Sequence, residues 1–238
     1  MGRFLLSILF SIWAISCLAL AEPIATVVAF AGNPTINGRA VTAHAVVEEH
    51  DTIVVSLGNV QLIFKDGTKL VVGESSSLVV EKYLMGDGNT ASSFAVDALR
   101  GTFRFITGRS AKAAYNIQTA NSTIGIRGTG FDFWVNNDTG VVVLEGKVRL
   151  CRKNGSINGK CVDIDAMCHG GAARTSGTQA MTGFELSQSI RNHLPYILDQ
   201  ARLSQPFHLA VAQCDKILTL TTEGSGSKDP PRRCGNRC

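Results

Sequence analysis

From residue 24 to about residue 151, the chain consists of short apolar runs, rich in β-branched residues, that alternate with turn-forming residues. A new run begins about every 8 to 15 residues, and no long stretch of helical apolar spacing interrupts the series. Such a series predicts an all-β sandwich, roll or solenoid over residues 22–150.

Three dipeptides in this region predict tight turns between neighbouring strands. Asn37-Gly38 and Asp66-Gly67 are the strongest, because these pairs favour the two-residue turns that join antiparallel strands. Glu145-Gly146 is also expected to close a two-residue hairpin, with glycine at its second position.

Three segments together resemble the FecR domain family, in order as well as in spacing. Residues 65–70, K-D-G-T-K-L, resemble the family's DG(S/T)xL turn. Residues 119–131 hold T-A and then G-I-R-G-T-G-F, similar to its T(P/A)…GxRGTxF signature, and residues 142–148, V-V-L-E-G-K-V, resemble its closing strand pair. The residues that carry the resemblance are Asp66, Gly67, Gly125, Arg127, Gly128, Thr129, Phe131, Glu145 and Gly146.

The resemblance implies a small twisted β-solenoid or β-roll that functions in the cell envelope. In iron-uptake regulators of this family, the domain lies in the periplasm, after a cytoplasmic anti-sigma region and one membrane span. There it receives a signal from an outer-membrane transporter. Because this sequence shows neither that region nor an internal span, it is expected to resemble the free-standing exported members.

The glycines around Arg127 predict a tight bend between two strands. Gly125, Gly128 and Gly130 are expected where a side chain would clash or where φ is positive. The Arg127 guanidinium could donate several hydrogen bonds to carbonyls at a strand end, and a ligand contact is the alternative. After the bend, alternate residues are expected to face inward: Phe131, Phe133 and Val135.

The first 21 residues have the pattern of a secretory signal peptide. Arg3 precedes an apolar run that ends at Leu20, and Ala19-Leu20-Ala21 matches the small-x-small cleavage site. Cleavage after Ala21 would leave a chain expected to be soluble in the periplasm or secreted. Two alternatives remain open, a retained membrane anchor and lipoprotein processing at Cys17.

Six of the seven cysteines lie after residue 150: Cys151, Cys161, Cys168, Cys214, Cys234 and Cys238. An even number of cysteines in an exported chain predicts disulfides. Asn-Gly pairs between Cys151 and Cys161 indicate a cross-linked hairpin, and the other four cysteines would then pair among themselves.

Zinc binding is the alternative for these residues. Cys161, Cys168 and His169 form a C-x6-C-H string, to which Cys234 and Cys238 could add two ligands. The spacing fits the usual zinc patterns poorly, so no metal or other cofactor is expected.

Residues 151–221 are expected to form a disulfide-linked extension of mixed structure with one or two helices. Apolar residues after Phe184 recur at helical spacing, and Pro195 would end or kink that helix. A second helix is expected between Gln205 and Leu218. This apolar stripe would pack on the β-domain or, alternatively, dock a partner. Residues 222–238 hold G-S-G-S, P-P and R-R, which predict a flexible tail.

No catalytic motif is present: the sequence lacks G-x-S-x-G, H-E-x-x-H and a phosphate-binding glycine loop. The net charge of +4, without a dense Lys/Arg block, argues against nucleic acid as a partner. We therefore expect a non-enzymatic binding module of the bacterial envelope that relays a signal to an envelope protein or membrane receptor. The alternative is a structural or adhesive protein that contacts glycan or peptidoglycan.

Overall fold

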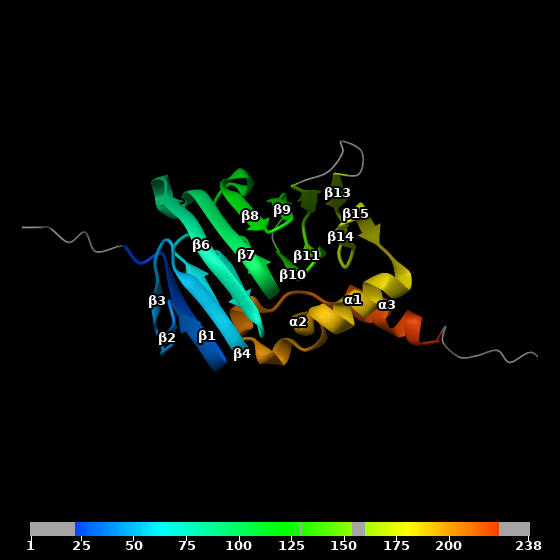
Figure 1. The fold of residues 1–238 in the computed structure, drawn as a ribbon, viewed down its shortest axis with the longest axis horizontal. Coiled ribbons are helices and arrows are strands. Elements are labelled where there is room, and N and C mark those ends of the chain that lie inside the picture. The colour runs from blue at the N-terminus through cyan, green and yellow to red at the C-terminus, as the bar shows by residue number, and fades with distance from the viewer. Residues whose placement is uncertain (1–21, 129, 154–159, 224–238) are drawn as a thin grey trace, which may run out of the picture.

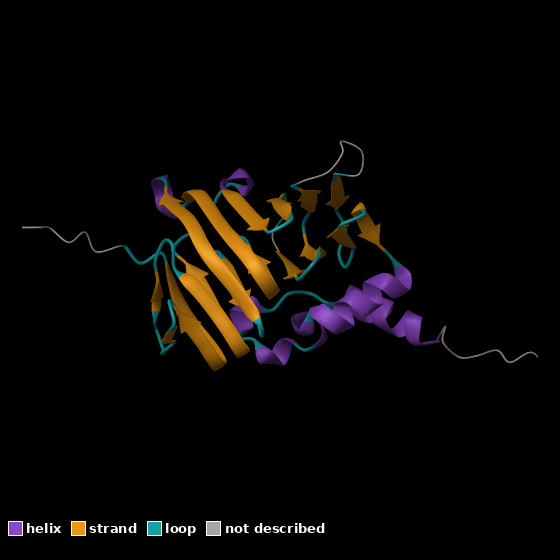
Figure 2. Ribbon diagram, viewed as in Figure 1, coloured by secondary structure: helices purple, strands orange, loops and turns teal. Residues whose placement is uncertain are grey.

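The structure is a computed structural model that describes residues 22–128, 130–153 and 160–223. Figure 1 shows a body of strands with the three α-helices of the described residues gathered along one side of it, and Figure 2 separates strands from helices by colour. The strands are β1 (Ala25–Ile36), β2 (Arg39–Ala40), β3 (Val46–Val47), β4 (Thr52–Phe64), β5 (Lys69–Val72), β6 (Ser76–Met85), β7 (Ala91–Ile106), β8 (Tyr115–Thr119), β9 (Ser122–Ile126), β10 (Gly130–Val135), β11 (Thr139–Glu145), β12 (Val148–Arg152), β13 (Cys161–Ile164), β14 (Gly170–Arg174) and β15 (Gly177–Met181). The α-helices are α1 (Gly183–His193), α2 (Pro195–Leu198) and α3 (Ala212–Glu223), and 3-10 helices span Asp87–Asn89, Lys112–Ala114, Gln200–Arg202 and Gln205–Phe207.

The strands form one connected sheet that folds over itself. Its main path runs β13-β12-β9-β8-β7-β10-β11-β14-β15, and β1 to β6 join it through β4, β5 and β7. The two ends of this path meet, because the Thr178 hydroxyl of β15 donates to the Lys160 carbonyl next to β13 at 3.0 Å. Every pair is antiparallel except β7 with β8.

Long bent strands allow the sheet to fold. The first half of β7 pairs with β6 and β8, whereas its second half pairs with β5 and β10. β4 bends at Gly58, which lies opposite Gly32 of β1, and both glycines have positive φ. A Cβ on Gly58 would lie 2.0 Å from the Ala31 carbonyl oxygen, so these bends require glycine.

The main core lies inside the folded sheet and is rich in phenylalanine. Ring centroids of neighbouring aromatic residues lie 4.7 to 5.9 Å apart, within the range favourable for aromatic pairs. Six phenylalanines are almost wholly buried there: Phe64, Phe94, Phe103, Phe105, Phe131 and Phe133.

A second core lies on the outer face of β10, β11 and β14, where the helical extension covers the sheet. Trp134 and Leu144 face outward from the strands and pack with Leu186 and Ile190 of α1. The strand β10 is therefore buried on both faces. The predicted inward residues are indeed buried, but Asp132 and Trp134 between them are buried too.

The coarse fold prediction is confirmed: the chain is mostly β-strand, followed by a helix-containing and disulfide-linked part. The stacked parallel coils of a solenoid are not evident, since antiparallel pairing dominates the described residues. The sheet also continues past residue 150, because β13 and β14 pair with β12 and β11. Helix α3 begins later than expected and extends into the predicted tail, to Glu223.

Two of the three predicted hairpins are present. Asn37-Gly38 joins β1 to β2, and the turn at Asp66-Gly67 joins β4 to β5. The prediction of a hairpin at Glu145-Gly146 is wrong, because the strands on either side of it have other partners. β11 pairs with β10 and β14, while β12 pairs with β9 and β13. These residues instead carry the chain from one layer of the folded sheet to the other.

Candidate functional site

The Asp66-Gly67 motif forms a buried polar hub. The Asp66 carboxylate accepts hydrogen bonds from the hydroxyls of Ser110 at 2.6 Å, Thr68 at 2.8 Å and Tyr115 at 2.8 Å. The backbone N–H of Asp66 donates to the Tyr83 hydroxyl at 2.9 Å. The motif therefore ties the β4–β5 turn to residues far along the chain.

The hydrogen bonds of this hub together shift the pKa of Asp66 more than burial does. Burial alone would raise the pKa of the Asp66 carboxyl, but the bonds from Ser110, Thr68 and Tyr115 hold that pKa below its ordinary value. Burial raises the pKa of the Tyr115 hydroxyl, which stays a proton donor to the carboxylate. The Asp66 carboxylate is occupied by these hydrogen bonds within the protein, so its role is structural.

The glycine-rich motif is a close-packed crossing of two chain segments. A Cβ on Gly128 would lie 2.0 Å from the Lys147 backbone nitrogen, and one on Gly130 would lie 2.8 Å from the Leu209 side chain. Gly125 has room for a Cβ, and none of these three glycines has positive φ. Thr129 lies outside the described residues.

The Arg127 side chain does not make the contacts that its predicted structural role requires. Its backbone N–H donates to the Lys147 carbonyl at 2.9 Å, but the side chain is exposed and its guanidinium makes no hydrogen bond to the described residues. The predicted bonds to strand-end carbonyls are therefore missing. Glu145 and Gly146 are exposed beside it, and Gly146 has positive φ.

Two disulfides are formed, Cys151–Cys161 and Cys168–Cys214. The first is the predicted hairpin cross-link, since the two residues are direct partners in β12 and β13. The second ties the loop before β14 to α3. The zinc alternative is wrong for Cys161 and Cys168, because a disulfide sulfur is not a thiolate ligand. Cys234 and Cys238 lie outside the described residues.

A buried ion pair fixes the helical extension to the sheet. The Arg104 guanidinium donates to the Asp132 carboxylate at 2.7 and 2.9 Å, and both side chains are fully buried. Its remaining donors reach the Gln200 side chain at 2.7 Å and the Phe207 carbonyl at 3.1 Å. Burial raises the pKa of the Asp132 carboxyl, while the Arg104 charge opposes that shift.

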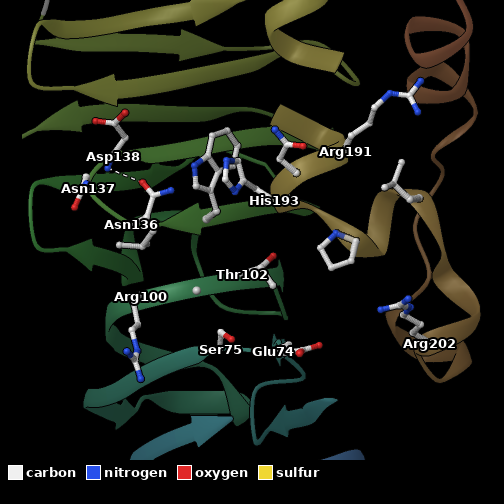
Figure 3. A pocket seen from close by; sticks show the side chains of 16 residues that line it. Glu74, Ser75, Arg100, Thr102, Asn136, Asn137, Asp138, Arg191, His193 and Arg202 are labelled. Atoms are coloured by element: carbon white, nitrogen blue, oxygen red, sulfur yellow. Dashed lines mark hydrogen bonds between the residues drawn. The ribbon is translucent and has the colours of Figure 1, made fainter. Parts of the chain in front are cut away.

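An open groove of about 1100 Å³ lies between this extension and the ends of the strands. Figure 3 shows its side chains around an open space, with strand and turn residues on one side and helical residues on the other. The sheet contributes the turn at Glu74 and Ser75, the β7 residues Arg100 to Thr102, and the turn at 136–138. The extension contributes residues 191–193 at the end of α1, then Pro195, Leu198 and Arg202.

An aromatic stack forms part of the groove wall. The rings of Trp134 and His193 lie 5.0 Å apart and nearly parallel, at 16°. Burial lowers the pKa of the His193 imidazole, so the stacked ring is neutral at neutral pH. The Thr102 hydroxyl, on a residue only 9% exposed, has no hydrogen-bond partner in the described part of the chain.

The sequence did not indicate this groove. Its residues come from several separate segments, and none belongs to the FecR-like motifs. Arg100 lies within a strand and Asn136 directly follows one, and no recognisable spacing connects the two residues. Only their convergence in space makes a site, and the pairing of β7 with β10 produces that convergence.

The architecture defines an all-β domain whose outer face is covered by a helical extension, with an open groove between them. Within it, residues 51–149 match the family described as FecR protein, so this chain contains a FecR domain. The match confirms the family resemblance of the motifs at 65–70, 119–131 and 142–148. It covers less than half of the chain.

Solved structures that resemble part of this chain include two of a proposed anti-sigma factor from Parabacteroides distasonis, at 2.50 and 1.65 Å resolution. Each is 15% identical, with TM-scores of 0.45 and 0.43. They cover 58% and 59% of this chain, which spans 62% and 63% of theirs, less than two thirds. A comparison with curated proteins gives no match.

Among residues 22–223, apart from the gaps named above, no helix has the length and apolar character needed to cross a membrane. In the same residues, no group of three or more His, Cys, Asp or Glu side chains could hold a metal ion.

Proposed function

We propose that this chain is an exported, non-enzymatic binding module of the bacterial envelope, which relays a signal to an envelope protein or a membrane receptor. One observation carries the proposal: the groove has one wall from the sheet and the other from the extension. A partner in the groove contacts both parts at once. Binding therefore depends on how the extension rests on the sheet.

The chemistry of the groove supports binding rather than bond making. Its side chains are mainly amides, hydroxyls and guanidinium groups, which hold a polar partner through hydrogen bonds and charge. The pattern of residues 1–21 supports export, and the disulfides support an oxidising compartment. The FecR domain supports a signalling setting.

Affinity capture from a detergent-solubilised envelope tests this proposal, with the chain from Glu22 onward as bait. The decisive comparison uses two charge-reversed baits, Arg100→Glu in the groove and Arg149→Glu on the exposed face of β12. A membrane protein that binds the wild type and the Arg149 variant but not the Arg100 variant supports the proposal. It must also bind when purified. If the Arg100 variant captures the same protein as the wild type, the assignment of the groove as the binding site is contradicted.

A structural or adhesive role is the second candidate. The half-buried His193 ring and the nearby amides also suit the ring face and hydroxyls of a sugar. Retention of the wild-type chain on peptidoglycan, lost in Arg100→Glu, with no protein captured, would favour this role over signal relay.

A further inference from the structure

We propose that the groove binds an extended, acidic segment of a partner polypeptide. The inference rests on the function proposed above and specifies the chemistry of the ligand. Three features support it: the size of the groove, the unpaired amide groups along it, and the balance of its charges.

The groove is open and larger than most small-molecule pockets, which favours a segment of polypeptide over a compact ligand. Beside the main space of about 1100 Å³ lies a second hollow of about 330 Å³. The two share Glu74, Pro195 and Arg202, so they form one continuous surface that reaches Gly58 on β4. Small-molecule pockets are usually apolar and of roughly 300–1,000 Å³.

The protein already holds an extended segment of its own chain with carboxamide side chains. The side-chain nitrogen of Gln200 donates to the Leu209 backbone carbonyl at 2.7 Å, and the Leu209 backbone N–H donates to the side-chain oxygen of Gln200 at 2.8 Å. The Gln61 side chain likewise accepts the Ser204 N–H at 2.9 Å. A carboxamide therefore matches the backbone donor and acceptor of a single residue.

Similar groups stand unused in the groove. Within the described residues, the side-chain amides of Asn137 and Asn192 have no hydrogen-bond partner. Figure 3 shows Asn137 on the strand side of the groove. An extended peptide in the groove would give these groups the backbone partners they lack.

The charges of the groove favour an acidic segment. Two of its charged residues are already paired: Arg202 with Asp199 at 3.2 Å, and Asp138 with Arg174 at 3.8 Å. Arg100 has no ion pair in the described chain. Arg191 has none either and makes one hydrogen bond, to the Leu218 carbonyl at 3.0 Å, which leaves it further donors.

Glu74 is the one unpaired acidic residue of the groove, judged from the described residues. Carboxylates of a bound peptide would be attracted to Arg100 and Arg191 and repelled by Glu74. Loss of the positive charge at Arg100 and loss of the negative charge at Glu74 must therefore shift affinity in opposite directions. Opposite shifts in affinity distinguish specific binding in the groove from nonspecific association.

Fluorescence anisotropy tests the proposal with two labelled probes, a peptide of alternating Asp and Leu and its counterpart of alternating Lys and Leu. The mature chain should prefer the Asp peptide. Arg100→Glu should weaken its binding by about tenfold, and Glu74→Gln should tighten it by about threefold. Arg149→Glu is the matched control and should change nothing. Raising the salt should shrink both effects. Matching melting curves show that each variant is folded.

Equal affinity for the two peptides, or shifts of the same sign in both groove variants, would overturn the proposal. If acidic peptides do not bind but a purified envelope protein still requires Arg100, only the ligand assignment fails and the proposed function stands. If peptidoglycan fragments bind in an Arg100-dependent way instead, the ligand is a glycan and this inference is wrong.

Discussion

Arg104 and Asp132 join the sheet to the helical extension through a two-point ion pair that is fully buried. The pair itself links β7 to β10, while the remaining guanidinium donors hold Gln200 and the Phe207 carbonyl of the extension. A single side chain thus satisfies partners in both parts of the protein. The pair fixes how the extension lies on the sheet and, with it, the wall of the groove.

Replacing Asp132 by Asn should destabilise the protein strongly. The change leaves the Arg104 charge buried without its counterion, which costs about 3–5 kcal/mol for pairs of this kind. Asp163→Asn is the matched control, because the Arg149–Asp163 pair is exposed and 3.6 Å long, and it should cost less than about 1 kcal/mol. Denaturant unfolding of the three proteins measures both. Similar losses in the two variants would contradict the role given to the buried pair.

Asp66→Asn should also lower stability, in a way that depends on pH. The amide nitrogen cannot accept the hydroxyl hydrogen bonds that the carboxylate accepts, and the loss should be about 1–3 kcal/mol at neutral pH. Because the pKa of Asp66 is lowered in the folded protein, its ionised form stabilises the fold fully above the ordinary value of 3.8. That contribution is lost as the pH falls through the lower folded pKa.

The stability difference between wild type and Asp66→Asn should therefore shrink as the pH falls below 3.8. Urea unfolding at neutral and acidic pH measures it. A difference that stays constant over this range would show that the Asp66 charge does not stabilise the hub.

The local features of this fold could be predicted from the sequence, whereas its long-range pairing could not. Asn37-Gly38 and the Cys151–Cys161 hairpin were predictable because each joins strands that are neighbours along the chain. Glu145-Gly146 carries a similar turn pattern, but both neighbouring strands already have partners elsewhere. The turn residues alone do not reveal which strands a connection joins.

The candidate site was hidden for the same reason. In the sequence, Arg104 and Asp132 stand between phenylalanines and match the outward, solvated positions of alternating strands. The extension that buries them begins about 50 residues beyond β10. Arg100 and Trp134 meet in the groove only because β7 pairs with β10. Without an indication of that pairing, neither the ion pair nor the groove could be predicted.

The two disulfides should stabilise the protein unequally. In the chain-entropy picture, the Cys168–Cys214 link spans 46 residues and should contribute roughly 4 kcal/mol, against roughly 3 kcal/mol for the separation of 10 at Cys151–Cys161. Replacing each pair by alanine should lower the melting temperature more for Cys168 and Cys214. Loss of that link should also speed hydrogen exchange in α3. The reverse order of melting temperatures would contradict this ranking.

Gly128→Ala should disrupt folding, whereas Gly125→Ala should be tolerated. A Cβ at position 128 would lie 2.0 Å from the Lys147 nitrogen and 2.5 Å from the Gly146 Cα, and backbone atoms cannot move aside as a flexible side chain can. Overpacking of this kind costs about 3 kcal/mol or more. At position 125 the nearest atom is 3.6 Å away, so the change there should stay within about 0.5 kcal/mol. Unfolding curves of the two variants decide the matter: equal stability would show that the crossing beside the Glu145–Lys147 segment does not require glycine.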